Sequence, residues 1–334
     1  MSRYAATASA VLFLFAATFA PRASAIAASD AGDAARGAAL PTSLRDERLL
    51  DRERLRAWGI ERPSRLAFDE EGALYVLDAR TRRVIRLALG SRPASGDDAR
   101  DDADGALVFG DASVSSALPH DLVFDLRGSL LVLDRAGGTL LAYDSRAAYL
   151  GARNLDPSLA EEARSAEARL LRDAYGDLWL LAPREGDLVP LDGRLGRRRT
   201  GRFLTPEDSL SQPVAAAFLP HGGGWVADRG RALVSRFDAT GRIVGSASLG
   251  DSLGGTPTDL ASDDAGSLFI ADAGASRIVV LGPNGARLAT RWLGGATRPW
   301  TPGAIAWGGG DRVAVADESR DEIWIFSVRR ETTP

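Results

Sequence analysis

The chain has 334 residues, of which 45% are hydrophobic and 26% charged, and its formal net charge is −4. This composition is typical of a globular protein with one large domain or two ordinary ones, and its acidic balance argues against general nucleic-acid binding. The chain has no Cys and its basic residues are all Arg, which excludes disulfides, Cys-ligated zinc, iron–sulfur clusters and lysine-based catalysis.

Residues 1–25 have the features of a secretory signal peptide. Arg3 is followed by an apolar stretch at residues 10–17 and by the small-residue cleavage signal Ala23-Ser24-Ala25. The apolar stretch is shorter than the roughly 20 residues that a membrane-spanning helix needs. We therefore expect cleavage after residue 25, no membrane span afterwards, and a periplasmic or secreted protein. Residues 26–44 are Ala, Gly, Ser and Asp-rich without an apolar period, which predicts a flexible leader.

Six variations on one unit fill residues 45–330. They begin near residues 63, 119, 168, 213, 257 and 302. The clearest unit contains three apolar runs, at Pro257–Ala261, Gly266–Asp272 and Arg277–Leu281. Short runs rich in Val, Ile, Leu and Phe, separated by Gly and Asp turns, are typical of strands joined by hairpins. Their spacing of roughly 45 residues lies in the range of propeller blades. The sequence therefore predicts an all-β fold, a six-bladed β-propeller.

A fourth, more polar strand follows the third run in some units, for example at residues 287–292, but the last unit lacks one. The segment Arg54–Gly59, which precedes the first unit, reads like Arg287–Gly294 before the sixth. We therefore expect an N-terminal strand at residues 54–59 to pair into the last blade. Such pairing closes the ring and removes two exposed sheet edges.

The units share a pattern: a Pro, then Leu-Ala-x-Asp, then Gly-x-Leu-Tyr/Phe-Val/Ile-x-Asp, then Arg-Val/Ile. This pattern resembles the NHL repeat of six-bladed β-propellers, in the TolB-like and regucalcin-like group. The resemblance covers residues 54–328. The third unit departs from it at Ala182-Pro183, and the fourth at His221–Gly224. Such propellers include lyases, lactonases, dehydrogenases and binding modules, so the resemblance implies the fold and leaves the function open.

Catalytic signatures are sparse. A zinc lyase of this fold needs several histidines, and the chain has two, His120 and His221. A lactonase-like enzyme would hold a divalent metal with oxygen ligands, for which Glu61, His120 and Asp259 are the candidates, but Val214 stands where such enzymes have Asn. There is no Gly-x-Ser-x-Gly motif. We assign no catalytic residue, expect no cofactor, and interpret the acidic insertion at residues 97–105 as a solvated loop.

Two groups of residues are candidates for binding. The first lies where the first strands of the blades enter the central channel, and polar side chains there would orient a ligand: Arg65, His120, Asp121, Arg169 and Asp259. The second is a surface basic patch that suits an anionic glycan or lipid head group: Arg194, Arg197, Arg198, Arg199 and Arg202. The alternative for this patch is a sheet edge that charge protects from aggregation.

Aspartates that follow the second run of five units are interpreted as turn and blade-to-blade hydrogen-bonding residues: Asp78, Asp134, Asp228, Asp272 and Asp317. Together these features predict an exported, monomeric propeller that serves as a non-catalytic binding platform for a protein or an anionic glycan. The alternative is a metal-dependent hydrolase or lyase with its site at the channel mouth.

Overall fold

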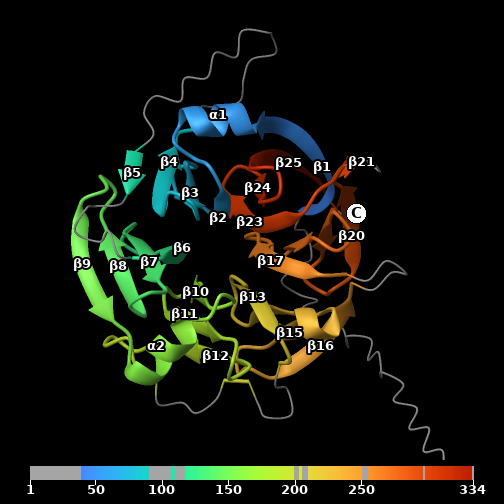
Figure 1. Ribbon diagram of the computed structural model, residues 1–334. Helices are drawn as coiled ribbons and strands as arrows, with labels where there is room; N and C mark the ends of the chain where they lie inside the picture. Colours follow the sequence, from blue (N-terminus) through green and yellow to red (C-terminus); the bar gives the residue numbers. More distant parts are fainter. Residues whose placement is uncertain are drawn as a thin grey trace, which may run out of the picture.

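The computed structural model describes residues 39–89, 107–109, 117–198, 203–204, 210–249, 255–295 and 298–332. Six small antiparallel sheets stand around a central axis and form a six-bladed β-propeller, as the repeat predicts (Figure 1). The expected signal peptide and the acidic insertion lie outside the described residues. Within the described residues, no helix has both the length and the apolar character needed to cross a membrane.

Each blade begins with a strand beside the central axis and continues outward. The strands of the first three blades are β2 (Pro63–Phe68), β3 (Leu74–Asp78), β4 (Arg83–Leu87) and β5 (Leu107–Phe109); β6 (Pro119–Phe124), β7 (Leu130–Asp134), β8 (Thr139–Tyr143) and β9 (Tyr149–Asn154); and β10 (Arg169–Arg172), β11 (Leu178–Ala182) and β12 (Asp187–Pro190). Within the described residues the third blade has three strands, and helix α2 (Pro157–Ala163) precedes it.

The other three blades have four strands each. These are β13 (Pro213–Phe218), β14 (Gly224–Asp228), β15 (Leu233–Phe237) and β16 (Ile243–Ser248); β17 (Pro257–Ser262), β18 (Leu268–Asp272), β19 (Arg277–Leu281) and β20 (Arg287–Trp292); and β23 (Pro302–Gly308), β24 (Arg312–Asp317), β25 (Glu322–Thr332) and β1 (Ala39–Leu50). A short hairpin, β21 (Gly294–Gly295) with β22 (Arg298–Pro299), and a 3-10 turn, η3 (Arg229–Arg231), lie in the connections.

Burial follows the position of a strand in its blade. Every residue of the second strands β3, β7, β14 and β18 is buried, because neighbouring blades cover both faces of the sheet. The outer strand β16 instead alternates between half-buried and exposed residues. The apolar core is accordingly distributed between blades rather than gathered at one centre: one cluster, for example, joins Leu66 and Val76 of the first blade to Ala304 and Ile323 of the last.

Strand β1 closes the ring by pairing antiparallel with β25, from Ala39 opposite Thr332 to Leu50 opposite Ile323. The prediction of an N-terminal closing strand is therefore confirmed, but the residues assigned to it were wrong. Residues 54–59 do not pair into the last blade; they lie in and just after the helix α1 (Arg52–Ala57), next to the closing strand in Figure 1. Likewise, residues 39–44 belong to β1 and not to a flexible leader.

The sequence of β1 hides its strand character for a physical reason. Register shifts between Pro41 and Ser43, and again between Asp46 and Arg48, interrupt the alternation by which a strand is recognised. Helix α1, in contrast, has an ordinary start, because the side chain of Asp51 accepts a hydrogen bond from the backbone N–H of Arg54. Its one buried residue is Leu55.

The repeated aspartates are buried and act within their own blades. The carboxylate of Asp78 accepts hydrogen bonds from the backbone N–H groups of Arg62 at 3.1 Å, Arg80 at 2.7 Å and Thr81 at 2.8 Å, and also from that of Glu61. It thereby ties the chain entering the first strand to the turn after the second. The other four also accept hydrogen bonds from backbone N–H groups just before the first strands of their own blades: Asp134, Asp228, Asp272 and Asp317. Of these, Asp134 and Asp317 accept further bonds from the turn after the second strand. The expected turn role is therefore present at Asp78, Asp134 and Asp317, whereas the expected blade-to-blade role was wrong, because these bonds stay within single blades.

Candidate functional site: the central chamber

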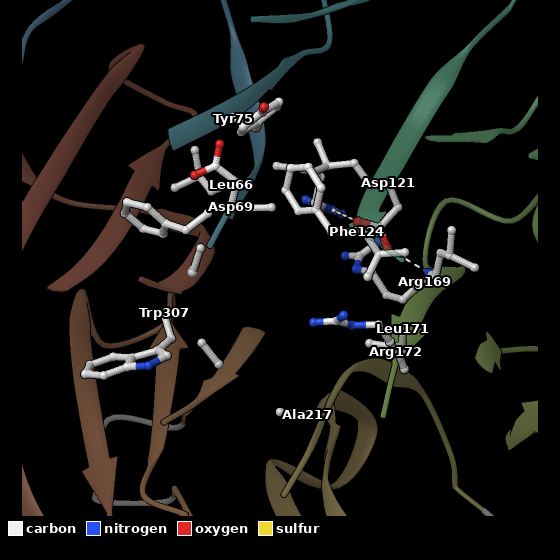
Figure 2. A pocket seen from close by; sticks show the side chains of 18 of the residues that line it. Leu66, Asp69, Tyr75, Asp121, Phe124, Arg169, Leu171, Arg172, Ala217 and Trp307 are labelled. Carbon is white, nitrogen blue, oxygen red and sulfur yellow. Dashed lines mark hydrogen bonds and ion pairs between the residues drawn. The ribbon is translucent and has the colours of Figure 1, made fainter. Parts of the chain in front are cut away.

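A cavity, here called the chamber, occupies the propeller axis and has a volume of about 730 Å³. Residues of the first strands of all six blades line it, together with the hairpins that follow β2 and β6. It therefore opens on the face formed by the hairpins between first and second strands. Figure 2 shows side chains from several blades converging on this open space.

Four charged side chains form what we call the charged floor of the chamber. They occupy equivalent positions near the start of the first strands of the first, second, third and fifth blades, and along the chain basic and acidic residues alternate: Arg65, Asp121, Arg169 and Asp259. The two equivalent residues in the remaining blades are Ala215 and Ala304. The structure thus brings together four of the five channel-mouth candidates along one cavity.

The two aspartates of the charged floor also hold adjacent blades together. Asp121 accepts a hydrogen bond from the backbone N–H of Leu170 in the next blade at 2.8 Å. Asp259 likewise accepts one from the backbone N–H of Ile305 at 3.0 Å. The floor therefore has a structural function besides any contact with a ligand.

Burial dominates the electrostatics of the charged floor. It raises the pKa of Asp121, although the neighbouring Arg169 and Arg65 act in the opposite direction. Burial and the like charge of Arg65 lower the pKa of Arg169 to about 10, against the opposing effects of Asp121 and Asp259. Arg169 still carries its positive charge at neutral pH.

His120, the fifth candidate, lies behind the floor rather than in the lining of the chamber. Its Nε2 is 3.3 Å from Nη1 of Arg169, so the ring nitrogen accepts a hydrogen bond from a guanidinium group. Burial, followed by the positive charges of Arg169, Arg65 and Arg135, lowers the pKa of His120 to about 3. The imidazole is therefore neutral at physiological pH and already engaged.

Replacing His120 with Gln is expected to make the protein less sensitive to acid. The pKa of His120 is about 3 in the folded protein, against 6.5 for an unperturbed imidazole. Between these two pH values the imidazole is protonated in the unfolded chain and neutral in the folded protein, so acid favours unfolding. This contribution to stability is complete above pH 6.5 and is lost as the pH falls towards 3. Its loss between pH 7 and pH 5 lowers the free energy of unfolding of the wild type by about 2 kcal/mol.

Urea denaturation of the wild type and of His120→Gln at these two pH values measures the difference. The variant should show a smaller loss between pH 7 and pH 5. Equal losses in both proteins would contradict the assignment of a buried, neutral imidazole.

A second, smaller cavity of about 220 Å³ lies on the other side of the charged floor. Its lining includes Thr258 and Gly303 at the starts of first strands, and Arg65 and Arg169 line both cavities. Arg65 is held there by its neighbours, with its Nη1 3.9 Å from a carboxylate oxygen of Glu318 and its Nε 3.9 Å from one of Asp121. The charged floor thus separates the axis of the propeller into two spaces.

Aromatic side chains form the upper wall of the chamber, one residue before the first strands turn into their hairpins. These are Phe68, Phe124, Phe218 and Trp307, and the equivalent residues of the third and fifth blades are Arg172 and Ser262. Tyr75 of β3 adds a fifth ring, in edge-to-face contact with Phe124 at 4.7 Å between centroids. The wall thus places large aromatic surfaces beside charged side chains, a combination that can hold and orient a small molecule.

Tyr75 and Arg86 belong to a paired cluster in this wall. The Nε of Arg86 is 3.3 Å from Asp69, its Nη2 is 3.0 Å from Glu71, and its guanidinium lies 5.9 Å from the centroid of the Tyr75 ring. Burial, with the charge of Asp69, raises the pKa of Tyr75 to about 12. The phenol therefore stays protonated, and this cluster presents no unpaired charge to the chamber.

Arg172 differs from these residues. Its side chain extends into the open space of the chamber, on the opposite side from Trp307 (Figure 2). It is half-buried, and its guanidinium has no hydrogen bond or ion pair with any residue that the structure describes. Arg172 was not among the predicted site residues; when the six units are aligned by register, it is the one charged residue at an otherwise mostly aromatic position.

The remaining candidates are occupied by neighbours within the chain. Glu61 pairs with Arg80 at 2.8 Å, and the described residues contain no group of three or more His, Asp and Glu side chains placed to hold a metal ion. In the basic patch, Arg197 pairs with Glu185 at 2.5 Å and Arg198 with Asp177 at 2.8 Å. The remaining members of the patch are Arg194, which is exposed, and Arg199 and Arg202, which lie outside the described residues.

No family model and no curated protein matches the sequence. Comparison with solved structures does find similar folds. A streptogramin B lyase is 12% identical with a TM-score of 0.59, over 86% of this chain and 98% of that one. The calcium-binding protein regucalcin from Agrobacterium tumefaciens is 14% identical with a TM-score of 0.56, over 82% and 92%. A luciferin-regenerating enzyme is 16% identical with a TM-score of 0.55, over 80% and 91%.

The fold is that of the six-bladed propellers. These identities establish the architecture, in agreement with the predicted resemblance to NHL-like and regucalcin-like propellers, and the function has to be argued from the chamber.

Proposed function

We propose that this propeller is a ligand-binding protein whose central chamber takes a small organic molecule. The observation that carries the proposal is the chamber itself, a space of about 730 Å³ with an aromatic wall, a charged floor and the guanidinium of Arg172, which has no partner among the described residues. Cavities of several hundred cubic ångströms in which aromatic surfaces and convergent polar groups meet are usual sites for small molecules. The signal-like segment at residues 1–25 supports the further proposal that binding takes place in the periplasm or outside the cell.

A catalytic use of the chamber is the alternative, because the similar structures include proteins named as lyases and as a luciferin-regenerating enzyme. The residues of this chain favour binding. The carboxylates of Asp121 and Asp259 are engaged by backbone N–H groups, and His120 stands behind the floor as a hydrogen-bond partner of Arg169. A general base needs a free acceptor within reach of its substrate. A protein or an anionic glycan bound at the basic patch remains a prediction.

Filling the chamber is expected to abolish ligand binding without unfolding the protein. Ala217 of β13 is a small residue in the lining of the chamber (Figure 2), so Ala217→Phe should reduce the affinity for ligands found by screening small molecules with the wild type. The matched control is Ala79→Phe, at an exposed turn outside the chamber, which should bind as the wild type does.

Thermal denaturation shows whether both variants are folded, and calorimetric titration measures their affinities. Ligands that bind Ala217→Phe and the wild type equally well would place binding elsewhere on the molecule.

A further inference from the structure

The buried carboxylates of the chamber are engaged, whereas several of its guanidinium donors have no partner among the described residues. Its carboxylates already accept bonds from the chain: Asp259 from the backbone N–H groups of Leu260 and Ile305, both at 3.0 Å, and Asp69 from that of Ala73 at 2.8 Å. Asp125 at the rim accepts two backbone hydrogen bonds of 2.8 Å within its own turn. A cationic ligand would therefore have to compete with bonds that the fold itself uses.

The donors, in contrast, are incompletely satisfied. The buried Nε atoms of Arg65 and Arg169 in the charged floor have no hydrogen-bond partner, and Arg169 is only 7% exposed. Above them, the guanidinium of Arg172 faces the chamber and has no partner among the residues that the structure describes. Buried polar groups are nearly always paired in native proteins, so these donors are available to an acceptor that enters the chamber.

We propose that the chamber binds an aromatic carboxylate, with the carboxylate on Arg172 and the aromatic ring against the surrounding Phe and Trp side chains; this inference rests on the proposed ligand-binding function. Arg172 occupies the same layer of the propeller as Phe124 in the preceding blade and Phe218 in the following one, with Trp307 across the axis. A planar acid can thus meet its cation and its stacking partners at one depth.

A carboxylate fits this layer better than a phosphate. Guanidinium groups bind both in a bidentate manner. The lining, however, contains slightly more carboxylates than guanidinium groups, among them Glu70 and Glu71 at the rim. A dianion entering the chamber would be repelled more strongly by these charges than a monoanion. The aromatic wall supplies the remaining affinity through the ring, which a small inorganic anion lacks.

The test compares three probes of one shape: 2-naphthoate, the uncharged 2-naphthamide and 2-naphthyl phosphate. Calorimetric titration at low salt measures their affinities for the wild type, for Arg172→Gln and for Arg127→Gln. Arg127 is an exposed Arg at the rim of the same chamber, so its variant removes an equal charge from the mouth while leaving the guanidinium inside.

The wild type should bind 2-naphthoate about 10-fold more tightly than 2-naphthamide, as expected for losing one charge-assisted pair. Arg172→Gln should bind the two probes about equally, and Arg127→Gln should keep the preference. Equal binding of acid and amide by the wild type, a preference that survives in Arg172→Gln, tighter binding of the phosphate, or no binding of 2-naphthoate at millimolar concentration would each overturn the inference.

The result also separates this inference from the proposed function. If the naphthyl acids fail but another small molecule binds the wild type and not Ala217→Phe, the chamber is a binding site for a different class of ligand. If no ligand distinguishes Ala217→Phe from the wild type, the proposed function itself is wrong.

Discussion

A chain that begins at residue 51, and so lacks strand β1, is expected to lose cooperative folding. Strand β1 pairs with β25 along nearly its whole length and places Leu44 and Leu50 in the apolar clusters beside the last blade. Without it, the 11 residues of β25 would present unpaired backbone groups and an uncovered apolar face. Such an edge is a template for pairing with other chains. We therefore expect aggregation and no sharp thermal transition.

The matched control is a chain that begins at Ala39, which removes everything before the closing strand and keeps the strand itself. Size-exclusion chromatography and calorimetry compare the two. A milder change to the same strand is Leu50→Ala, which truncates a fully buried side chain of β1 and should lower the free energy of unfolding by about 2–5 kcal/mol. Equally sharp transitions for the chains beginning at residues 39 and 51 would show that the ring does not need its closing strand.

Replacing Arg277 with Ala is expected to lower the free energy of unfolding by about 3–5 kcal/mol. Arg277 and Asp272 are 1% and 0% exposed, and the Nε of the arginine donates to the carboxylate at 2.7 Å. Its Nη2 donates to the backbone carbonyl of Leu249 in the preceding connection, also at 2.7 Å, and the guanidinium lies over Trp292 at 5.3 Å. Removing it leaves a buried carboxylate and a carbonyl without their partner.

The control for this variant is Arg231→Ala in the preceding blade. Arg231 is half-exposed and its Nε lies 3.7 Å from the repeated aspartate of its own blade, Asp228. Exposed pairs contribute about 0–1 kcal/mol, so this variant should be nearly as stable as the wild type. Urea denaturation at pH 7 measures both, and a loss below 1 kcal/mol for Arg277→Ala would contradict the importance of the buried pair.

The repeat made the architecture predictable because each blade has to solve the same packing problem. Glycine and aspartate turns between apolar runs locate the strands, and the Pro at the start of β2, β6, β13, β17 and β23 marks where each blade begins. The closing strand was expected, but its position at residues 39–50 was not, because its two bulges remove the period of two and a helix with the apolar residue Leu55 follows it. Local sequence cannot show that a strand pairs with residues nearly 300 positions away.

The lining of the chamber was predictable in part, although its role as a site stays a prediction. Arg65, Asp121, Arg169 and Asp259 were found because they are polar residues at a position where the first strand faces the axis, and all four do line the chamber. Arg172 was missed because it is distinguished by a guanidinium group that has no partner among the described residues. This property depends on the side chains that other blades place around it. The neutral state of His120 likewise depends on Arg169, 49 residues away in the chain.

The order in which the chain is made has a consequence for how it folds. Strand β1 is synthesised before the other strands of all six blades, and its partner β25 comes after nearly all of them, so β1 stays unpaired until the last blade has been made. Pairings between segments so far apart in the chain are slow to form. The ring therefore cannot close while the first five blades are being made, and chaperones or proteases can act on the open form.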